Sequence, residues 1–384
     1  MNVLEVPAVS MPPEAAELRR QVRDFLNDEI REGRIESKCD CWLSGFSASF
    51  SKRLGSRGWI GMTWPKEYGG HERSSLERYT VMEELLAFGA PVAGHWIADR
   101  QSGPLLLKYG TEEQKRHFLP KIASGECYFC IGLSEPNAGS DLAAIQTRAT
   151  KTEGGWILNG SKIWTSGAHF SHYMIALCRT EDPDPKNRHA GMSQLIVDLS
   201  SPGVSIRPII LMTGEHHFNE VFFDDVFIPD ERLIGTKGDG WAQSMAELAY
   251  ERSGPERFLS TFPLLNELTN SLLEKEDHQG LITVSRLMAR LWSLRNLSIG
   301  IAVQLEKDVP SNISAALVKD MGTQFEQEIA EFAREYTDVI PSVGSSDRLS
   351  RLMAESILQS PGFTLRGGTT EILRGIVAKE VIKA

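Results

Sequence analysis

Apolar residues recur every three or four positions in the first third of the chain, which is the spacing of one face of an α-helix. The longer of two such stripes consists of Leu18, Val22, Phe25, Leu26 and Ile30, and the shorter one of Phe46, Phe50 and Leu54. Farther on, Thr111 and Gln114 form the pattern of a capping box, in which each side chain bonds to the other residue's backbone N–H. This region is therefore predicted to be helical, with one helix beginning after Thr111.

The pattern changes near Cys127. From there to about Gly235, the chain is rich in glycine, serine, threonine and β-branched residues in short runs. Such runs favour β-strands bounded by turns. The apolar triplets at 195–197 and 221–223 are typical of two of these strands. We therefore expect a β domain in this part of the chain.

One hairpin is predicted within this β domain. The pair Asn159-Gly160 separates the run 156–158 from the run 161–164. An Asn-Gly pair supplies the positive φ angles that a type I′ turn requires, so it is a strong signal for a two-residue hairpin turn. The two runs are therefore expected to be separate, antiparallel strands.

The helical spacing returns after Gly240. One stripe consists of Leu317, Met321, Phe325, Ile329 and Phe332. The segment 282–299 is nearly apolar on two faces, as in a helix buried in a bundle or a subunit interface. The expected fold class is α+β, with a helical domain over residues 1–126, a barrel-like β domain over 127–235 and a C-terminal four-helix bundle over 236–384.

Length and charge narrow the class of protein. A chain of 384 residues with 41% hydrophobic and 24% charged residues is long enough for roughly two or three cooperating domains. A formal net charge of −10 argues against nucleic-acid binding, which needs a basic surface. No G-x-G-x-x-G follows a predicted strand, and no P-loop motif is present, so neither type of nucleotide site is supported.

Membrane spans, disulfides and metals are not expected either. The longest uncharged stretch, residues 85–98, is too short to cross a bilayer. The N-terminus has no basic segment followed by an apolar one, and Glu5 and Glu14 argue against a transit peptide. The pair Cys127 and Cys130 has no second cysteine pair or histidine cluster at zinc spacing. Buried, reduced thiols and a cytoplasmic location are therefore expected.

The densest group of potential ligand-binding residues is Ile131–Asp141, which reads IGLSEPNAGSD. Two glycines, a proline and small hydroxyl residues occupy a predicted strand-to-loop transition. Backbone N–H groups and the hydroxyls of Ser134 and Ser140 can approach a flat or charged ligand closely there. The same composition suits a tight surface turn stiffened by Pro136, and composition alone favours neither interpretation.

Four motifs occur in order along the chain and together resemble the acyl-CoA dehydrogenase family. They are S-E-P-N-A-G-S-D at 134–141, N-G-x-K-x-W-T-S-G at 159–167, N-E-V-F-F-D-D-V-x-I-P at 219–229 and G-G-T-T-E-I-L-R-G-I-V-A at 367–378. The helix–strand–helix order fits the same family, and the resemblance covers essentially the whole chain. It implies FAD as the cofactor, an acyl-CoA thioester as the substrate, and desaturation between the α and β carbons.

The resemblance also implies which residues bind the flavin. Four residues in the segment 131–140, which includes most of the first motif, would line the flavin and the thioester end of the substrate, with the last of them shared: Ile131, Leu133, Ser134 and Ser140. Trp164, Thr165 and Ser166 would lie along the isoalloxazine ring. The Ser166 hydroxyl would donate to N5, the atom that gains electron density when it receives hydride. Taken alone, a single strand tryptophan is more often part of the core.

The implied reaction needs a carboxylate that removes the α proton, and a buried glutamate is the usual solution. In much of the family this glutamate directly precedes the G-T near the C-terminus, where this chain has Gly367. Members similar to the isovaleryl and long-chain enzymes carry it on an earlier helix, just before an arginine. Tyr250, Glu251 and Arg252 stand at the matching point. The resemblance therefore implies Glu251 as the base, with its two neighbours beside the substrate; the alternative is a solvated carboxylate paired with Arg252 or another neighbour.

Gly367 keeps a catalytic role in this interpretation. Its backbone N–H would donate to the thioester oxygen, and Gly368 would lie beside the substrate. Thr369 and Glu371 match positions that reach the flavin chain. Because the base is moved to the earlier helix, the loop around Gly367 has more room, and we expect a branched or bulky acyl chain.

Two stretches depart from the family pattern. Many members carry Arg-x-x-Phe-Gly where the neighbouring subunit grips the FAD pyrophosphate, and this chain has Glu274–Gln279 there. Farther on, Gly-Gly-x-Gly is replaced by Pro341–Gly344. The chain either pairs with a related subunit that supplies what it lacks, as in some bacterial dehydrogenases of steroid breakdown, or is a homo-oligomer, dimeric or tetrameric, that binds the pyrophosphate through other residues.

Three functions stay open at this point. An active dehydrogenase is favoured because Trp164, Ser166 and Glu251 are intact. A non-catalytic subunit that completes a partner's site, with weak FAD binding of its own, accords with the missing pyrophosphate motifs. An acyl-CoA oxidase, which passes electrons to oxygen, would carry the same motifs. For a dehydrogenase, the resemblance implies an electron-transferring flavoprotein as the electron acceptor.

Overall fold

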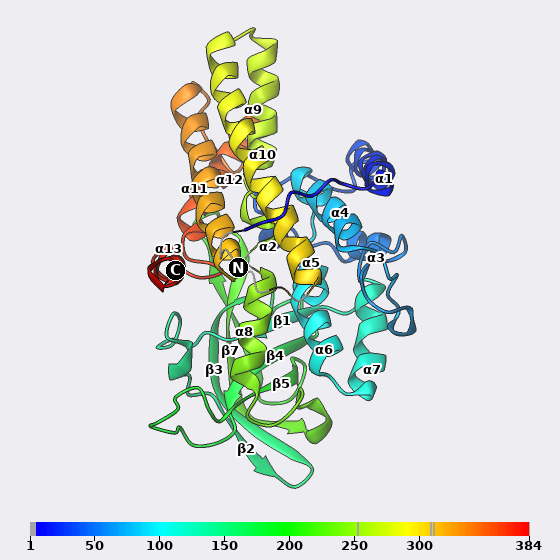
Figure 1. The fold of residues 1–384 in the computed structure, drawn as a ribbon, viewed down its shortest axis with the longest axis vertical. Helices are drawn as coiled ribbons and strands as arrows, with labels where there is room; N and C mark the ends of the chain where they lie inside the picture. Colours follow the sequence, from blue (N-terminus) through cyan, green and yellow to red (C-terminus); the bar gives the residue numbers. More distant parts are fainter. Residues whose placement is uncertain (1–4, 252, 308, 310–311, 384) are drawn as a thin grey trace. The chain divides into compact units, whose positions relative to one another are not determined.

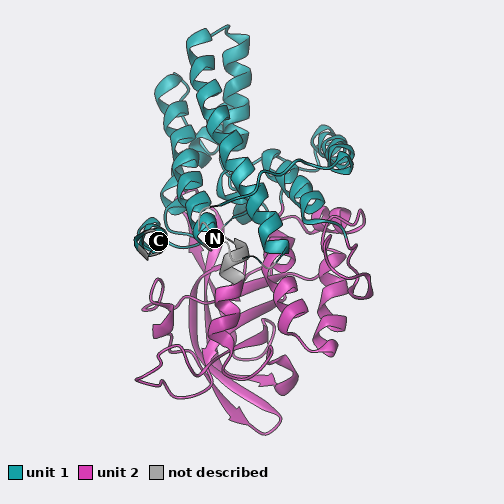
Figure 2. Cartoon of the chain, in the orientation of Figure 1, with its two compact units in different colours: residues 1–45, 73–91, 249–384 teal, residues 46–72, 92–248 magenta. Residues whose placement is uncertain are grey.

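The computed structural model describes residues 5–251, 253–307, 309 and 312–383, and Figure 1 shows the order of their helices and strands. The chain divides into two compact units (Figure 2). The first unit comprises Met1–Gly45, Arg73–Pro91 and Ala249–Ala384, and the second comprises Phe46–Glu72 and Val92–Leu248. The first unit is helical, and the second contains the β-sheet.

The first unit is built around α11, which packs against α9, α10, α12 and α13, while α1 packs on α4. The helical elements of this unit are α1 (Pro13–Arg31), α2 (Cys41–Ser44), α4 (Ser75–Ala87), η5 (Pro255–Arg257), α9 (Phe262–Glu274), α10 (His278–Glu306), α11 (Asn312–Tyr336), α12 (Arg348–Phe363) and α13 (Thr370–Lys383). The stripe predicted near the N-terminus lies on α1, where Leu18, Val22 and Leu26 are buried. Helices at both ends of the chain are thus confirmed.

The inner face of α11 differs from the predicted stripe. Phe325 and Ile329 are buried as expected, whereas Met321 is 41% exposed. Gly322 and Glu326 lie on the buried face instead. A Cβ at Gly322 would lie 2.2 Å from a backbone oxygen of η5, so the absence of a side chain lets η5 approach the helix closely. The apolar spacing therefore predicted the helix but not the whole of its buried face.

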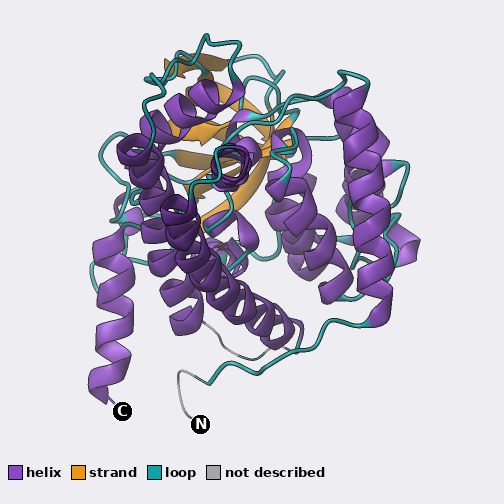
Figure 3. Cartoon of the chain, turned by 90° about the horizontal axis from the view of Figure 1, so that it is seen from above, coloured by secondary structure: helices purple, strands orange, loops and turns teal. Residues whose placement is uncertain are grey.

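The second unit carries one seven-stranded sheet among the described residues, visible as the orange layer in Figure 3. Its strands are β1 (Phe129–Gly132), β2 (Arg148–Thr152), β3 (Gly155–Ser166), β4 (Tyr173–Arg179), β5 (Met192–Asp198), β6 (Val204–Ile210) and β7 (His216–Pro229). The strand order is β1-β4-β2-β3-β7-β6, and β5 pairs with β4. Residues such as Leu158, Leu195 and Val221 form the core beneath it. The α+β class, with the strands between two helical regions in the order of the chain, is confirmed.

The remaining helices of the second unit include α3 (Ala48–Gly55), α5 (Ala93–Ile97), α6 (Gly103–Tyr109), α7 (Glu112–Ala123) and most of α8 (Gly240–Glu251). The capping box before α7 is confirmed, because Thr111 Oγ1 accepts from the Gln114 N–H at 3.2 Å and Gln114 Oε1 accepts from the Thr111 N–H at 3.1 Å. No helix in the described part of the chain has the length and apolar character needed to cross a membrane.

The predicted hairpin at Asn159-Gly160 is wrong. Both residues lie inside the continuous strand β3, and the chain reverses instead at 153–154, between β2 and β3. The β7 residues 224–225 lie opposite Asn159, whose Oδ1 accepts from the Asp225 N–H at 2.9 Å. A Cβ at Gly160 would lie 2.7 Å from Thr147 Oγ1. The Asn-Gly pair therefore lies at a β-bulge between β3 and β7, where the missing side chain of Gly160 also lets Thr147 come close. Asn and Gly suit such a bulge as well as a hairpin turn.

Candidate active site

Trp164 lies in a bulge of β3 at the edge of the predicted flavin site. Lys162 pairs with Val221 and Thr165 with Asn219, so two residues of β3 face the single residue Glu220. The φ angle of Trp164 is +58°, a left-handed conformation that glycine usually takes in such bulges. The indole is 56% exposed and meets the Phe218 ring edge-on at 5.8 Å. The bulge therefore presents a large flat side chain to the outside of the sheet.

The side chain of Asn219 closes this bulge from the neighbouring strand. Asn219 is fully buried, and its Nδ2 donates to the Thr165 carbonyl oxygen at 3.0 Å. Its Oδ1 accepts from His216 Nε2 at 2.7 Å, and Nδ2 also contacts His169 Nδ1 at 3.2 Å. The two imidazole rings stack at 3.8 Å. Burial, followed by the charge of His216, lowers the pKa of His169, which favours the neutral ring that can accept from Nδ2.

The residues that follow Trp164 fit a polar ligand. Thr165 is 1% exposed, and its Oγ1 is buried without a hydrogen-bond partner in the described part of the chain. Ser166 is half-buried at the end of β3. Buried hydroxyls are normally paired, so an unpaired one beside an exposed indole fits a site that a bound molecule completes. An exposed indole next to two hydroxyl residues would fit a flat ligand with polar atoms, as a flavin is.

The first motif lies beside the bulge. Ile131 is in β1 and Leu133 follows it, and the Ile163 N–H donates to the Ser134 carbonyl oxygen at 2.9 Å. Ser134 is half-buried, whereas Ser140 is exposed. The structure thus brings Ser134 together with the Trp164 bulge. A tight turn, one of the two interpretations of this segment, is present, because Glu135 and Ala138 exchange two backbone hydrogen bonds across Pro136 and Asn137.

A buried ion pair fixes the first motif to β3. Lys162 Nζ lies 2.7 Å from Glu135 Oε1 and donates to the Leu133 carbonyl oxygen at 3.1 Å. Glu135 also accepts from the backbone N–H groups of Gln146 and Thr147, at 2.6 and 3.0 Å. Burial raises the pKa of Glu135, but Lys162 and these donors outweigh it, so the pKa lies below the ordinary value. The sequence did not lead us to predict this pair, although Lys162, a charged residue within the motif at 159–167, could have indicated a buried partner.

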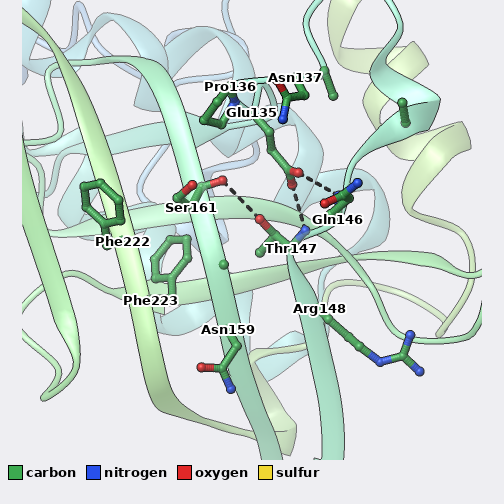
Figure 4. Close-up of a pocket in the computed structure, with 13 residues that line it drawn as sticks. Glu135, Pro136, Asn137, Gln146, Thr147, Arg148, Asn159, Ser161, Phe222 and Phe223 are labelled. Carbon is green, nitrogen blue, oxygen red and sulfur yellow. Dashed lines mark hydrogen bonds between the residues drawn. The ribbon is translucent and has the colours of Figure 1, made fainter.

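A pocket of about 610 Å³ lies on the same unit (Figure 4). Its walls are the 135–138 turn, residues 144 and 146–148, and residues 159–161 and 222–223 of β3 and β7. Figure 4 shows the Glu135 carboxylate directed toward Gln146 and Thr147, which matches its hydrogen bonds. The predicted flavin residues Trp164 and Ser166 are not among its lining, so this hollow is separate from the indole surface.

The second set of predicted residues belongs to the first unit. Gly367 and Gly368 lie between α12 and α13 with φ angles of +67° and +100°. A Cβ at Gly367 would lie 2.9–3.0 Å from three guanidinium atoms of Arg257. Thr369 Oγ1 accepts from the Ile372 N–H at the start of α13, and Glu371 is exposed in its first turn. The backbone conformation therefore favours glycine at 367, and the Arg257 guanidinium lies where a side chain would begin.

The predicted base falls at the end of α8, whose last residue is Glu251. The side chains of Tyr250 and Glu251, and the whole of Arg252, lie outside the described residues. Their roles stay predictions. In the stretch that departs from the family pattern, Asp277 caps α10 by accepting from the Gly280 N–H at 3.0 Å and from the Tyr336 hydroxyl at 3.1 Å. The acidic residue there serves the helix start.

Comparison with known proteins identifies the family. The model described as acyl-CoA dehydrogenase, N-terminal domain, matches residues 12–126, and that described as acyl-CoA dehydrogenase, middle domain, matches residues 130–226. The acyl-CoA dehydrogenases IpdE1 and FadE29 of Mycobacterium tuberculosis (strain ATCC 25618 / H37Rv) are 35% and 31% identical to this chain. These alignments cover 95% and 98% of this chain, and 97% and 98% of the relatives.

Solved structures agree. The Tcur3481–Tcur3483 steroid ACAD matches with a TM-score of 0.84 at 29% identity, over 100% of this chain and 99% of the other. The ChsE4–ChsE5 complex from Mycobacterium tuberculosis matches with a TM-score of 0.83 at 28% identity, over 98% and 99%. Together with the four motifs and the geometry of the bulge, these matches place the chain in the acyl-CoA dehydrogenase family, as an FAD-dependent oxidoreductase of acyl-CoA thioesters.

Proposed function

We propose that this chain desaturates a branched or bulky acyl-CoA thioester, with Glu251 as the base and the Gly367 N–H as a donor to the thioester oxygen. FAD, when bound, supplies the acceptor for the hydride that leaves the β carbon. The observation that carries the proposal is the β3 bulge, where an exposed indole at Trp164 stands next to the hydroxyls of Thr165 and Ser166. These residues would hold and orient the flavin ring.

The proposed base must meet three conditions to remove the α proton. An α proton next to a thioester is removed only if the carboxylate is ionised, close and not held by another cation. The resemblance implies that some members of the family act from this helix, which ends at Glu251, whereas Gly367 has no side chain to do so. The Gly367 N–H would stabilise negative charge on the thioester oxygen as the α proton departs.

A bulky acyl chain is supported by two observations. Position 367 contributes no side chain to the loop between α12 and α13. The Tcur3481–Tcur3483 steroid ACAD, which has a similar fold and 29% identity, is named for a bulky class of substrate. A kinetic panel tests this point: straight-chain acyl-CoAs of short and long chain would be compared with branched and polycyclic ones. We expect the highest kcat/KM for a branched or polycyclic thioester, and a maximum at a short straight chain would contradict it.

We propose further that the chain works in an oligomer with a related subunit. The ChsE4–ChsE5 and Tcur3481–Tcur3483 structures each contain two different chains by name. The use of Asp277 as a helix cap, in place of an arginine and phenylalanine, supports a partner that grips the pyrophosphate. An electron-transferring flavoprotein would then reoxidise the flavin. Mass measurement of the chain expressed alone and with a candidate partner, together with the FAD content of each, tests this proposal.

A second candidate function follows from the loss of the family's pyrophosphate-binding pattern in this chain. A chain whose pyrophosphate-binding residues are replaced can serve as a non-catalytic subunit that completes a partner's site. In that case Glu251→Gln would leave the activity of the mixed oligomer unchanged. A loss of activity in the mixed oligomer would instead place the base in this chain. An acyl-CoA oxidase is distinguished by oxygen consumption during turnover.

A further inference from the structure

Arg366, the residue before Gly367, is held by an enclosed set of partners. Its Nη1 donates to both carboxylate oxygens of Asp40, with the Oδ2 contact at 2.6 Å, and its Nη2 donates to Ser260 Oγ at 2.8 Å. The guanidinium also lies over the rings of Trp42 and Phe363, at 4.7 and 4.5 Å. The Arg366 side chain is only 13% exposed. An arginine that is paired with a carboxylate, bonded to a hydroxyl and stacked on two rings has little freedom, so it fixes the backbone next to it.

A second carboxylate lies behind this contact. Glu326 on α11 is 1% exposed, and its Oε1 accepts from the Ser260 N–H at 2.8 Å. Its Oε2 lies 3.7 Å from Arg366 Nη2. The Ser260 carbonyl oxygen accepts from the Asp40 N–H at 2.8 Å. Asp40, Ser260, Glu326 and Arg366 thus form one connected group within the first unit, called here the Arg366 anchor.

The backbone on both sides of the Arg366 anchor is in left-handed conformations. Asp40 has a φ angle of +52°, which is costly for a residue with a side chain. Gly367 and Gly368 follow Arg366 with φ angles of +67° and +100°. Such conformations persist where the surroundings over-determine them. Here the contacts that Arg366 and Asp40 make with their neighbours stabilise these conformations.

A second guanidinium faces the turn. Arg257 is 1% exposed and stacks over the same Trp42 ring at 5.0 Å, and its guanidinium lies against Gly367. The Gly367–Gly368 turn is therefore fixed by its covalent neighbour Arg366, and the Arg257 guanidinium packs against it. A turn held in this way can keep a backbone N–H in one direction.

We propose that Arg366 is a positioning residue: with Asp40, Ser260 and Glu326 it holds the Gly367–Gly368 turn so that the Gly367 N–H meets the thioester oxygen, and the charge of Glu326 sets how firmly it does so. The inference rests on the proposed function, which gives the Gly367 N–H its task. Ionised Glu326 gives Arg366 a second anionic neighbour; protonated Glu326 leaves it with Asp40 and Ser260.

The charge of Glu326 changes in an accessible pH range. Burial raises its pKa to about 7, against the opposing effect of Arg366 and of the Ser260 donor, and the Asp40 charge adds to the rise. Other charged groups on the packed elements are engaged elsewhere or lie beside the anchor. They are Glu256 and Arg257 in η5, Lys319 bonded to Thr323 and Phe363, Arg290 paired with Glu328, and Arg374 paired with Asp320. The turn is therefore expected to be firmer above pH 7 than below it.

The test uses full-length protein with FAD and its partner subunit, if one is needed. The probe is an acyl-CoA analogue with sulfur in place of the β carbon, which can lose its α proton but cannot lose a β hydride. The rate of α-proton exchange with deuterated water, measured by mass spectrometry, reports polarisation of the thioester directly. The variants are Arg366→Lys and Glu326→Gln. Arg374→Lys is the control, because Arg374 is a 61% exposed arginine on the next helix that pairs with Asp320 at 3.1 Å, outside the Arg366 anchor.

We expect Arg366→Lys to slow exchange by about tenfold or more, as loss of donor alignment does, while Arg374→Lys does not. For wild type, exchange should rise between about pH 6 and about pH 8 with a component that Glu326→Gln removes. Exchange by Arg366→Lys equal to wild type, or an identical pH profile for Glu326→Gln, would overturn the inference. If the proposed function itself is wrong, the result is different, because the wild type would then neither exchange the probe nor oxidise any thioester.

A second readout does not depend on the reaction. A carboxyl whose pKa is raised on folding contributes stability that is present below its unfolded pKa and is lost as pH rises through the folded pKa. The wild type should therefore lose unfolding free energy from about pH 5 to about pH 7 relative to Glu326→Gln. Parallel stability curves for the two proteins would show that Glu326 does not titrate there and would overturn the pH part of the inference.

Discussion

Asn219 and Thr165 lie opposite each other on β7 and β3, and the buried Asn219 amide donates to the Thr165 carbonyl oxygen at 3.0 Å. This contact stands directly after the bulge that turns Trp164 outward. The side-chain donor therefore adds a hydrogen bond between the two strands where the bulge ends. The direction of the indole, and with it the surface offered to the flavin, therefore depends on a residue on the neighbouring strand.

We expect Asn219→Ala to lower the unfolding free energy by about 2–3 kcal/mol, because it removes the buried amide that donates to the Thr165 carbonyl oxygen and accepts from His216 Nε2. The FAD-to-protein ratio should fall with it. Denaturant unfolding and visible absorbance measure the two effects. Asn159→Ala is the matched control, since Asn159 makes a similar pair of contacts to Asp225 at an exposed position. Equal stability and FAD content in both variants would contradict the role of Asn219.

Breaking the Glu135–Lys162 pair should be more costly. Lys162→Met leaves the Glu135 carboxylate buried without its cation, and we expect a loss of about 3–5 kcal/mol. Lys151→Met, which removes an equally short but exposed pair with Asp230, should cost less than about 1 kcal/mol. Chemical denaturation measures both variants. Similar small losses for the two would show that the carboxylate finds other partners when the lysine is absent.

Acid should loosen the bulge through His169. Its pKa is lowered by burial and by His216, so the folded protein binds less protons here than the unfolded chain does. Stability is then present above the ordinary histidine pKa of about 6.5 and is lost as pH falls through the lowered value. His169→Asn, which keeps an acceptor for Asn219 but does not titrate, should retain stability and FAD better than wild type as the pH falls below about 6.5. The exposed His278→Asn is the control and should behave as wild type.

The proposed base gives the largest expected effect. Glu251→Gln keeps the size of the side chain but cannot accept the α proton, so flavin reduction by an acyl-CoA should slow by roughly three orders of magnitude or more. FAD content should not change. Stopped-flow absorbance measures the rate, with Glu274→Gln at the exposed end of α9 as the control. Near-normal reduction by Glu251→Gln would place the base elsewhere.

The order of helices and strands could be predicted because each element shows its own apolar spacing, as the α1 stripe and the 195–197 and 221–223 strands do. The hairpin prediction failed because Asn-Gly suits a bulge as well as a turn. Which of the two forms depends on the strand that lies alongside, here β7 with Asp225 opposite Asn159.

The supporting contacts of the site could not be predicted in the same way. Glu135 and Lys162 lie within the quoted motifs, but their burial as a pair depends on the packing of β1 against β3. Asp40 and Arg366 are 326 positions apart, and no local pattern links them. Residues that hold a site in place come together only in the folded chain, whereas residues that contact the ligand can be recognised as local sequence motifs.

The central claim is that this chain carries a flavin that an acyl-CoA thioester can reduce. The most direct test is the visible spectrum of the purified protein, alone and with its partner subunit, before and after anaerobic addition of an acyl-CoA panel. The account predicts a yellow protein whose flavin absorbance is bleached by branched or polycyclic thioesters, and bleaching that Glu251→Gln abolishes. A flavin-loaded protein whose absorbance no thioester changes, or whose bleaching persists in Glu251→Gln, would contradict it.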